Sequence, residues 1–362
     1  YSGGYQTTKL MTILGNGNVG IGIANPANKL DVVTSTGDVV IASRSTSNTS
    51  GHDAIFLANV AGTSAGDPYI RFNIDNIGAW SVGIDNSDSD KFKISGLSSV
   101  LGTNDRFVLD TNSLISLSNN DSNTGNTIIG KSIFNNSSNN DSDYNTLMGA
   151  DVMGTGAVAG ASHNVGIGSS ALNDATTASD NIAIGSSAML NSTTADNNVV
   201  IGREAIGSGV STGNDNIVIG KSAGLTLTSG ANNTILGSYA GDAMTTMSNC
   251  ILIGYNAGTA INHNAANGTT IVGRDAGERL TNGTKNTVMG YSALTGNHQG
   301  GHNTVIGYES ARGVTDNAHS FNSAVGYRSL YAVTSGGSNT VMGYLAGSAL
   351  TTGGNNTALG AN

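Results

Sequence analysis

The chain has 362 residues, a formal net charge of −9, 52 glycines and only 11% charged residues. With two prolines it cannot be collagen, and with so few charges it does not have the composition of a charge-driven disordered chain. The negative charge argues against nucleic acid as a partner, because phosphate binding relies on Lys and Arg.

Residues 17–32 read GNVGIGIANPANKLDV. Val19, Ile21 and Ile23 alternate with glycine as in a strand, and Asn25-Pro26 favours a turn before a second strand. The segment resembles a signature that recurs in tail-fibre proteins. We therefore assign residues 1–37 to a collar.

Residues 67–95 alternate between apolar and polar side chains over three predicted strands. The segment is similar to a module common in phage receptor-binding fibres. The single tryptophan, Trp80, is interpreted as a core residue rather than a platform for a sugar. We assign residues 38–120 to a β-rich fibre module and residues 121–362 to a repetitive shaft.

The shaft is built on a pentapeptide, Asn-x-apolar-apolar-Gly, that begins as NTIIG at 126–130 and ends as NTALG at 356–360. Fourteen copies, including the variants CILIG and TTIVG, follow one another at steps of 17, 18 or 19 residues. Such a step is too short for a helix with its strand and turns. The repeat therefore predicts about fourteen coils of a β-solenoid.

Two adjacent apolar residues precede most closing glycines, as in Ile235-Leu236 and Leu252-Ile253. Neighbouring strand residues point to opposite faces, so both faces of each strand need to be buried. One face can be buried inside the coil, and the other requires a partner. We therefore predict symmetric self-association.

Two further positions recur in each coil. An alanine, or serine at 310 and 329, usually lies three residues after the glycine, which predicts a second strand in close contact with its neighbours. The recurrent asparagine is interpreted as a turn residue or a stacked amide ladder rather than a ligand-binding residue.

The pattern NTxIGxxA over residues 120–362 resembles the head repeats of trimeric autotransporter adhesins and, more closely, repeats of phage and viral tail fibres. The resemblance implies a left-handed parallel β-roll assembled as a homotrimer. The coil is somewhat longer than the adhesin repeat.

Candidate chemical motifs are all given structural interpretations. The histidines at 52, 163, 263, 298, 302 and 319 have no zinc-binding spacing, and Cys250 alone cannot form a disulfide within the chain. GTSAG at 62–66 and GKSAG at 220–224 lack the context of a nucleophile elbow. GNTIIGKS at 125–132 matches a phosphate loop in letters, but its interior is the repeat strand.

The cluster Asp85, Asp88 and Asp90 lacks the pattern of a calcium loop and is interpreted as a solvated hairpin tip. We therefore predict no catalytic, cofactor or metal site. Variable turns around His163 and around 260–263 are the places where a receptor could bind.

No apolar run reaches the roughly 18 residues that span a bilayer. The first 30 residues also lack a basic start followed by an apolar block. The chain begins at Tyr1 and ends at Asn362, two residues past a repeat, as we expect of a fragment or a processed product.

The sequence predicts a non-enzymatic structural fibre protein of a phage or virus, extracellular on the virion, that contributes to host attachment. Its expected partners are two further copies of itself, other tail or fibre proteins, and a host cell-surface receptor or glycan. A trimeric adhesin on a bacterial cell surface is the alternative, and a glycan-cleaving tailspike is a third possibility with little support from the sparse carboxylates.

Overall fold

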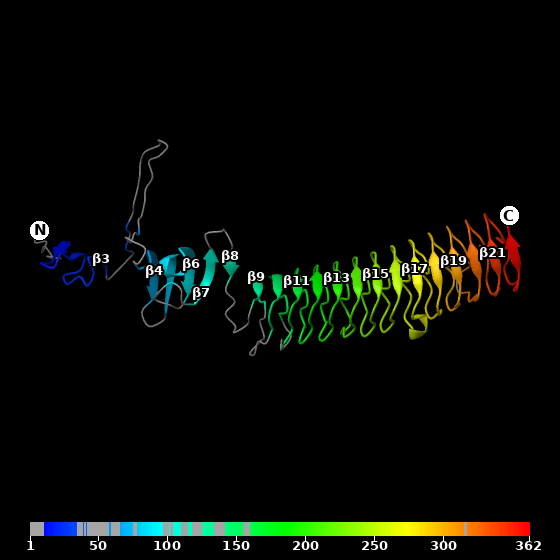
Figure 1. Ribbon diagram of the computed structural model, residues 1–362, viewed down its shortest axis with the longest axis horizontal. Helices are drawn as coiled ribbons and strands as arrows, with labels where there is room; N and C mark the ends of the chain where they lie inside the picture. The colour runs from blue at the N-terminus through cyan, green and yellow to red at the C-terminus, as the bar shows by residue number, and fades with distance from the viewer. Residues whose placement is uncertain are drawn as a thin grey trace, which may run out of the picture.

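The computed structural model describes residues 11–34, 66–74, 78–96, 104–109, 115–117, 125–133, 142–154, 160–314 and 317–362, with single positions 39, 41, 58 and 101. These residues form an all-β chain with two short 3-10 helices, η1 and η2. Three separate sheets follow one another in chain order along the longest axis (Figure 1).

The first sheet has three short strands, β1 (Met11–Ile13), β2 (Val19–Ile21) and β3 (Leu30–Val32). β2 pairs antiparallel with β1 and parallel with β3. The carboxylate of Asp31 accepts hydrogen bonds from the backbone N–H groups of Ala27 (2.6 Å) and Asn28 (3.1 Å) and so holds the turn before β3. The predicted strand, turn and strand are present.

The second sheet is an antiparallel meander in the order β4-β5-β6-β7-β8. Its strands are β4 (Tyr69–Ile74), β5 (Gly78–Asp85), β6 (Lys91–Gly96), β7 (Asp105–Leu109) and β8 (Ile115–Leu117). The helix η1 (Asn86–Asp88) joins β5 to β6 and is capped by the side chain of Asp85. All three strands predicted between residues 67 and 95 are therefore present.

Large apolar residues of this sheet share one face, because they lie opposite one another in the antiparallel register. Phe72 pairs with Trp80, and Ile84 pairs with Phe92. Phe72 is 61% exposed and Trp80 45% exposed. The interpretation of Trp80 as a core residue is therefore wrong for the single chain: the buried face is the opposite, more polar one.

The third sheet is a stack of fourteen parallel strands, β9–β22, each paired in register with the next (Figure 1). Thirteen turns of chain connect the first strand to the last, so the parallel β-solenoid is confirmed. The strands are β9 (Thr127–Lys131), β10 (Thr146–Ala150), β11 (Val165–Ile167), β12 (Ile182–Ile184), β13 (Val199–Ile201), β14 (Ile217–Ile219), β15 (Thr234–Leu236), β16 (Ile251–Ile253), β17 (Thr270–Val272), β18 (Thr287–Met289), β19 (Thr304–Ile306), β20 (Ser323–Val325), β21 (Thr340–Met342) and β22 (Thr357–Leu359). The helix η2 (Asn264–Ala266) lies in the turn between β16 and β17.

The core of the solenoid is a column of side chains inside the coils. The residue two positions before the closing glycine, such as Ile235 or Leu252, is buried in twelve of the fourteen coils, and Ile128 and Ala358 in the two end coils are half-buried. The recurrent alanines are buried beside this column, for example Ala240 and Ala257. They lie in turns rather than in strands, so the predicted second strand is absent from these coils. A tight turn brings a small residue into the core without needing a strand.

The closing glycines are required by both conformation and space. Gly254 has φ 137°, and a Cβ added there would lie 2.4 Å from the carbonyl oxygen of Gly273 in the next coil. Side chains rarely adopt such a φ, and the stacking distance leaves no room for one. This explains why glycine recurs at the end of every strand.

The recurrent asparagines form buried ladders of amides. Asn216 donates from its backbone N–H (2.9 Å) and its Nδ2 (3.0 Å) to Oδ1 of Asn198, and from Nδ2 to the carbonyl of Gly230 (3.0 Å). The same bonds recur from Asn164 to Asn233 and from Asn286 to Asn356. Cys250 and Thr269 interrupt the series. The amide-ladder interpretation is therefore confirmed.

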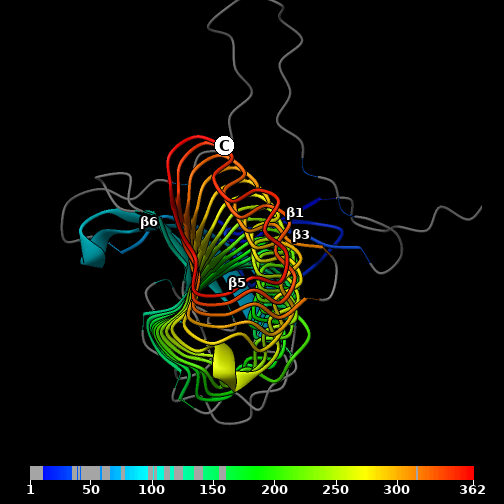
Figure 2. The same ribbon diagram turned by 90° about the vertical axis from the view of Figure 1, so that its right-hand side faces the viewer.

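The coils are not stacked in strict translation. Seen along the solenoid in Figure 2, successive coils are rotated progressively from green through yellow to red. Such a rotation is expected because adjacent β-strands twist with a fixed hand.

Candidate functional site: an outward apolar face

Three rows of side chains run along the outside of the sheet β9–β22, because strand residues alternate between the inside and the outside of each coil. The central row consists of the residues directly before the closing glycines. The leading row consists of the residues two positions before the central row, that is, three positions before each glycine. The trailing row consists of the residues directly after the glycines.

The central row is aliphatic in every coil. Seven of its fourteen residues are exposed, including Met289 (48%) and Met342 (51%), and the others are half-buried. Its members are Ile129, Met148, Ile167, Ile184, Ile201, Ile219, Leu236, Ile253, Val272, Met289, Ile306, Val325, Met342 and Leu359. At about 4.8 Å per strand the row is on the order of 60 Å long. Soluble monomers rarely expose a contiguous apolar surface of that extent.

The trailing row carries a ladder of stacked tyrosines near its C-terminal end. Tyr291, Tyr308, Tyr327 and Tyr344 stack with ring centroids 5.1–5.3 Å apart and rings within 10–11° of parallel. The guanidinium of Arg274 continues the ladder, 5.8 Å from the ring of Tyr291. Sequence reasoning missed this ladder, although the repeated Gly-Tyr dipeptide could have indicated it.

Two arginines, Arg203 in the trailing row and Arg328 beside it, are paired within the chain. Arg203 contacts Glu204 (2.8 Å), and Arg328 contacts Glu309 (2.6 Å). The hydrogen bond from Arg203 lowers the pKa of the Glu204 carboxyl. These pairs leave the apolar rows free of unpaired charge at those positions.

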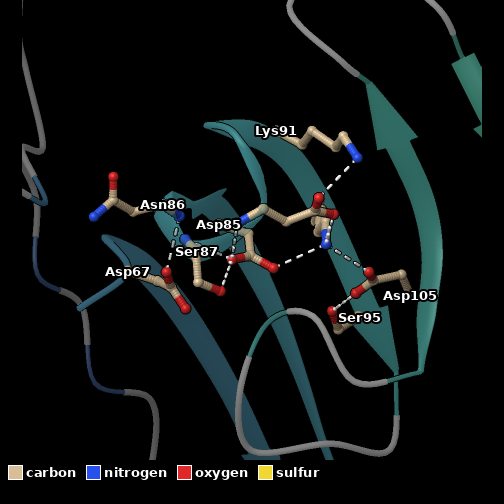
Figure 3. A network of polar contacts seen from close by, with 9 residues as sticks. Asp67, Asp85, Asn86, Ser87, Lys91, Ser95 and Asp105 are labelled. Atoms are coloured by element: carbon tan, nitrogen blue, oxygen red, sulfur yellow. Dashed lines mark hydrogen bonds and ion pairs between the residues drawn. The ribbon is translucent and has the colours of Figure 1, made fainter. Parts of the chain in front are cut away.

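The second sheet holds a polar cluster at the β5–β6 turn (Figure 3). The ammonium of Lys93 lies 2.8 Å from Asp85, 2.7 Å from Asp88 and 3.0 Å from Asp105. Lys93 and Asp85 are buried, so the prediction of a solvated tip is wrong for Asp85, whereas Asp90 is exposed. The chain covers this polar face of the sheet, and pairing with Lys93 makes burial of the carboxylate possible.

Hydrogen bonds from Lys91 and Lys93 lower the pKa of Asp88 to about 2. Burial raises the pKa of Asp85, but the hydrogen bond and charge of Lys93, together with hydrogen bonds from Ser87 and the Asp88 N–H, lower it overall. The lysine ammonium thus occupies the position among the carboxylates that a cation would need. In the part of the chain that is described, no group of three or more His, Cys, Asp or Glu is arranged to hold a metal ion.

Among the described histidines, His298 and His302 lie in the coil between β18 and β19, and His163, His263 and His319 lie in three other coils. His163 stacks on Tyr144 and His302 on Phe321, each with centroids 5.0 Å apart. His319 is buried, and burial lowers its pKa to about 4. In the other variable turn, His263 is exposed and Ile261 buried.

The sequence motifs that resemble enzyme signatures belong to the repeat or lie outside the described residues. Gly220–Gly224 forms the turn after β14, and residues 127–131 form β9. His52, residues 62–65 of GTSAG and the segment 134–141 after the phosphate-loop match lie outside the described residues.

A polar hollow of about 380 Å³ lies across neighbouring coils near the C-terminal end. Its described lining residues are Glu278, Arg279, Thr295, Gly296, Arg312, Gly313 and Val314. Arg312 donates from Nη1 to the hydroxyl of Tyr331 (2.7 Å). Both signs of charge are present, and these lining residues do not include a histidine or cysteine.

The chain matches no protein-family model, no curated protein and no solved structure. Over the described residues, none of the helices has the length and apolar character needed to cross a membrane.

Proposed function

We propose that the chain is a structural fibre protein of a phage or virus, a tail or side fibre that holds a host-binding element away from its base. It acts as a homotrimer of left-handed coils, on the outside of the virion, and joins other tail or fibre proteins. The proposal is supported by an elongated stack of coils together with the resemblances of residues 17–32, 67–95 and 120–362 to fibre proteins.

The observation that carries the proposal is the outward apolar surface on all three sheets. Leu30 in the first sheet is 56% exposed, Phe72 in the second 61%, and Met342 in the third 51%. Each of the three consecutive sheets leaves apolar side chains uncovered on one face. This favours side-by-side association of copies along all three sheets. Complete burial of a fully exposed side chain of this kind contributes roughly 1.5–3 kcal/mol, so each of these half-exposed side chains would contribute about half as much.

The test is the mass and shape of the purified chain. Sedimentation equilibrium should give three times the mass of one chain, and electron microscopy should show a rod whose solenoid part is about 60 Å long. A stable monomer at micromolar concentration would contradict the assembly.

Attachment and location are tested separately. The assembled chain should bind host cells or their surface glycans, and antibodies against it should label virus particles at a fibre. Labelling of a bacterial surface instead would favour the trimeric adhesin, which shares the repeat and the assembly.

The proposed fibre turns over no substrate. Two carboxylates, Asp275 and Glu309, are the candidates for a catalytic role. Asp275 contacts Arg274 (3.2 Å), and Glu309 contacts Arg328 (2.6 Å). Incubation with host glycans should give binding without cleavage. Multiple-turnover cleavage abolished by Glu309→Gln would overturn the non-enzymatic assignment.

A further inference from the structure

The leading row is threonine in β9 and β10 (Thr127 and Thr146), and from β11 onward it changes character once, after β16. In strands β11–β16 it is aliphatic apart from Thr234, with Ile182 37%, Ile217 45% and Ile251 41% exposed. In strands β17–β22 it contains only threonine and serine. The members from β11 onward are Val165, Ile182, Val199, Ile217, Thr234, Ile251, Thr270, Thr287, Thr304, Ser323, Thr340 and Thr357.

The trailing row changes in the opposite sense. From β11 to β15 it is polar or charged, and from β16 to β21 it is tyrosine in every coil except for Arg274. The members are Ser169, Ser186, Arg203, Lys221, Ser238, Tyr255, Arg274, Tyr291, Tyr308, Tyr327 and Tyr344. The central row stays aliphatic throughout. The outward apolar surface therefore moves from one side of the central row to the other.

We infer that the solenoid meets other copies of itself along a line that crosses the sheet obliquely. The contact would use the leading and central rows from β11 to β16 and the central and trailing rows from β16 to β21. The centre of the apolar surface shifts by two residues, about 7 Å, over roughly 24 Å of stacked strands. Because the coils rotate progressively, as in Figure 2, a straight symmetry axis beside them would meet a line that moves across the sheet.

A second copy is the occupant that the spacing favours. The surface repeats with every strand over many coils, so a rigid partner has to present side chains with the same axial spacing. The chain itself has that spacing, and in a symmetric oligomer the same stripe is repeated on every copy. The internal pairing of Arg203 with Glu204 and of Arg328 with Glu309 also reduces the cost of burying the neighbouring rows.

This inference rests on the proposed self-association and is tested by matched substitutions in the two halves. In the leading row, Ile217→Glu should weaken association by roughly a hundredfold, whereas Thr304→Glu should change it by less than about threefold. In the trailing row the order should reverse: Tyr308→Glu should weaken association and Ser186→Glu should not. Sedimentation measures association, and circular dichroism identifies variants that fail to fold.

Cross-linking keeps the test independent of stability. Ile217→Cys or Tyr308→Cys should give disulfides between copies, and Thr304→Cys or Ser186→Cys should give far fewer. Cys250 can remain, because it is buried and burial raises the pKa of its thiol.

The outcomes separate the two proposals. A monomeric parent chain would overturn both the self-association and the oblique contact. An assembled parent in which Ile217 and Thr304 behave alike, and Tyr308 and Ser186 behave alike, would overturn only the oblique contact.

Discussion

The second sheet and the solenoid distribute their apolar residues in opposite ways. In the second sheet the large side chains, such as Phe72 and Trp80, face outward, while Ser81, Lys93 and Ser95 are buried. In the solenoid, aliphatic residues occupy both the inside and the central row outside.

The difference lies in what each region needs to keep its shape. A coil of the solenoid contributes completely buried residues such as Leu252 and Ala257 to a continuous core, so one chain can hold the stack together. The second sheet is held by its ladder hydrogen bonds and by the Lys93 cluster, and its apolar face needs another surface to cover it. Assembly should therefore matter more for the second sheet.

The largest expected effect comes from placing a charge inside a coil. Leu252→Asp should cost more than about 4 kcal/mol of folding free energy, because the carboxylate would be buried without a partner. Ile253→Asp, one residue later on the outside, should instead weaken assembly and leave single coils folded. Asn264→Asp, at an exposed turn position, should change neither. Denaturant melts and sedimentation of the three variants distinguish these effects, and equal shifts for all three would contradict the assignment of inside and outside.

The next effect concerns the second sheet. Lys93→Met should destabilise it by about 3–5 kcal/mol, because Asp85 would lose its buried counter-charge. Lys91→Met removes a partly exposed contact to Asp88 of 2.8 Å and should cost less than about 1 kcal/mol. Hydrogen exchange of the β5 and β6 amides measures both. A similar loss of protection in the two variants would mean that Lys93 does not hold the buried carboxylate.

The smallest effect is a dependence on pH in the last third of the solenoid. The ring of His319 is buried with Nδ1 3.2 Å from Nδ2 of Asn322, and its pKa falls from 6.5 to about 4. The unfolded chain takes up a proton at higher pH than the folded chain. Stability should therefore decline as pH falls from 6.5 to about 4, by up to about 3 kcal/mol.

His319→Gln should remove that decline, whatever it does to stability at neutral pH, and His298→Gln should leave it in place. Asp88 acts in a different window, because its lowered pKa contributes stability that is lost between pH 3.8 and about 2. Of these two groups, therefore, only His319 affects melts measured between pH 7 and pH 4. If stability declined with falling pH in His319→Gln as it does in the parent chain, the decline would come from another group.

The sequence by itself determined the solenoid, its coil length and its register. Parallel coils place equivalent residues directly above one another, so a repeat such as Asn-x-apolar-apolar-Gly specifies its own neighbours. The burial of Leu252, the amide ladder and the need for glycine at position 254 follow from that stacking. The absence of a second strand did not follow, because a small residue fits a strand or a tight turn equally well.

Only the tertiary structure decided which face of the second sheet is covered. Alternation assigns Trp80 to one face and Ser81 to the other, but it does not say on which side the rest of the chain lies. The environment of Asp85 depends on Lys93, eight residues away across a hairpin, and its burial is possible because the ammonium is there. The tyrosine ladder likewise depends on how the rings are oriented in coils whose tyrosines are 17 or 19 residues apart. The repeat length places these tyrosines in one row but does not determine the orientation of their rings.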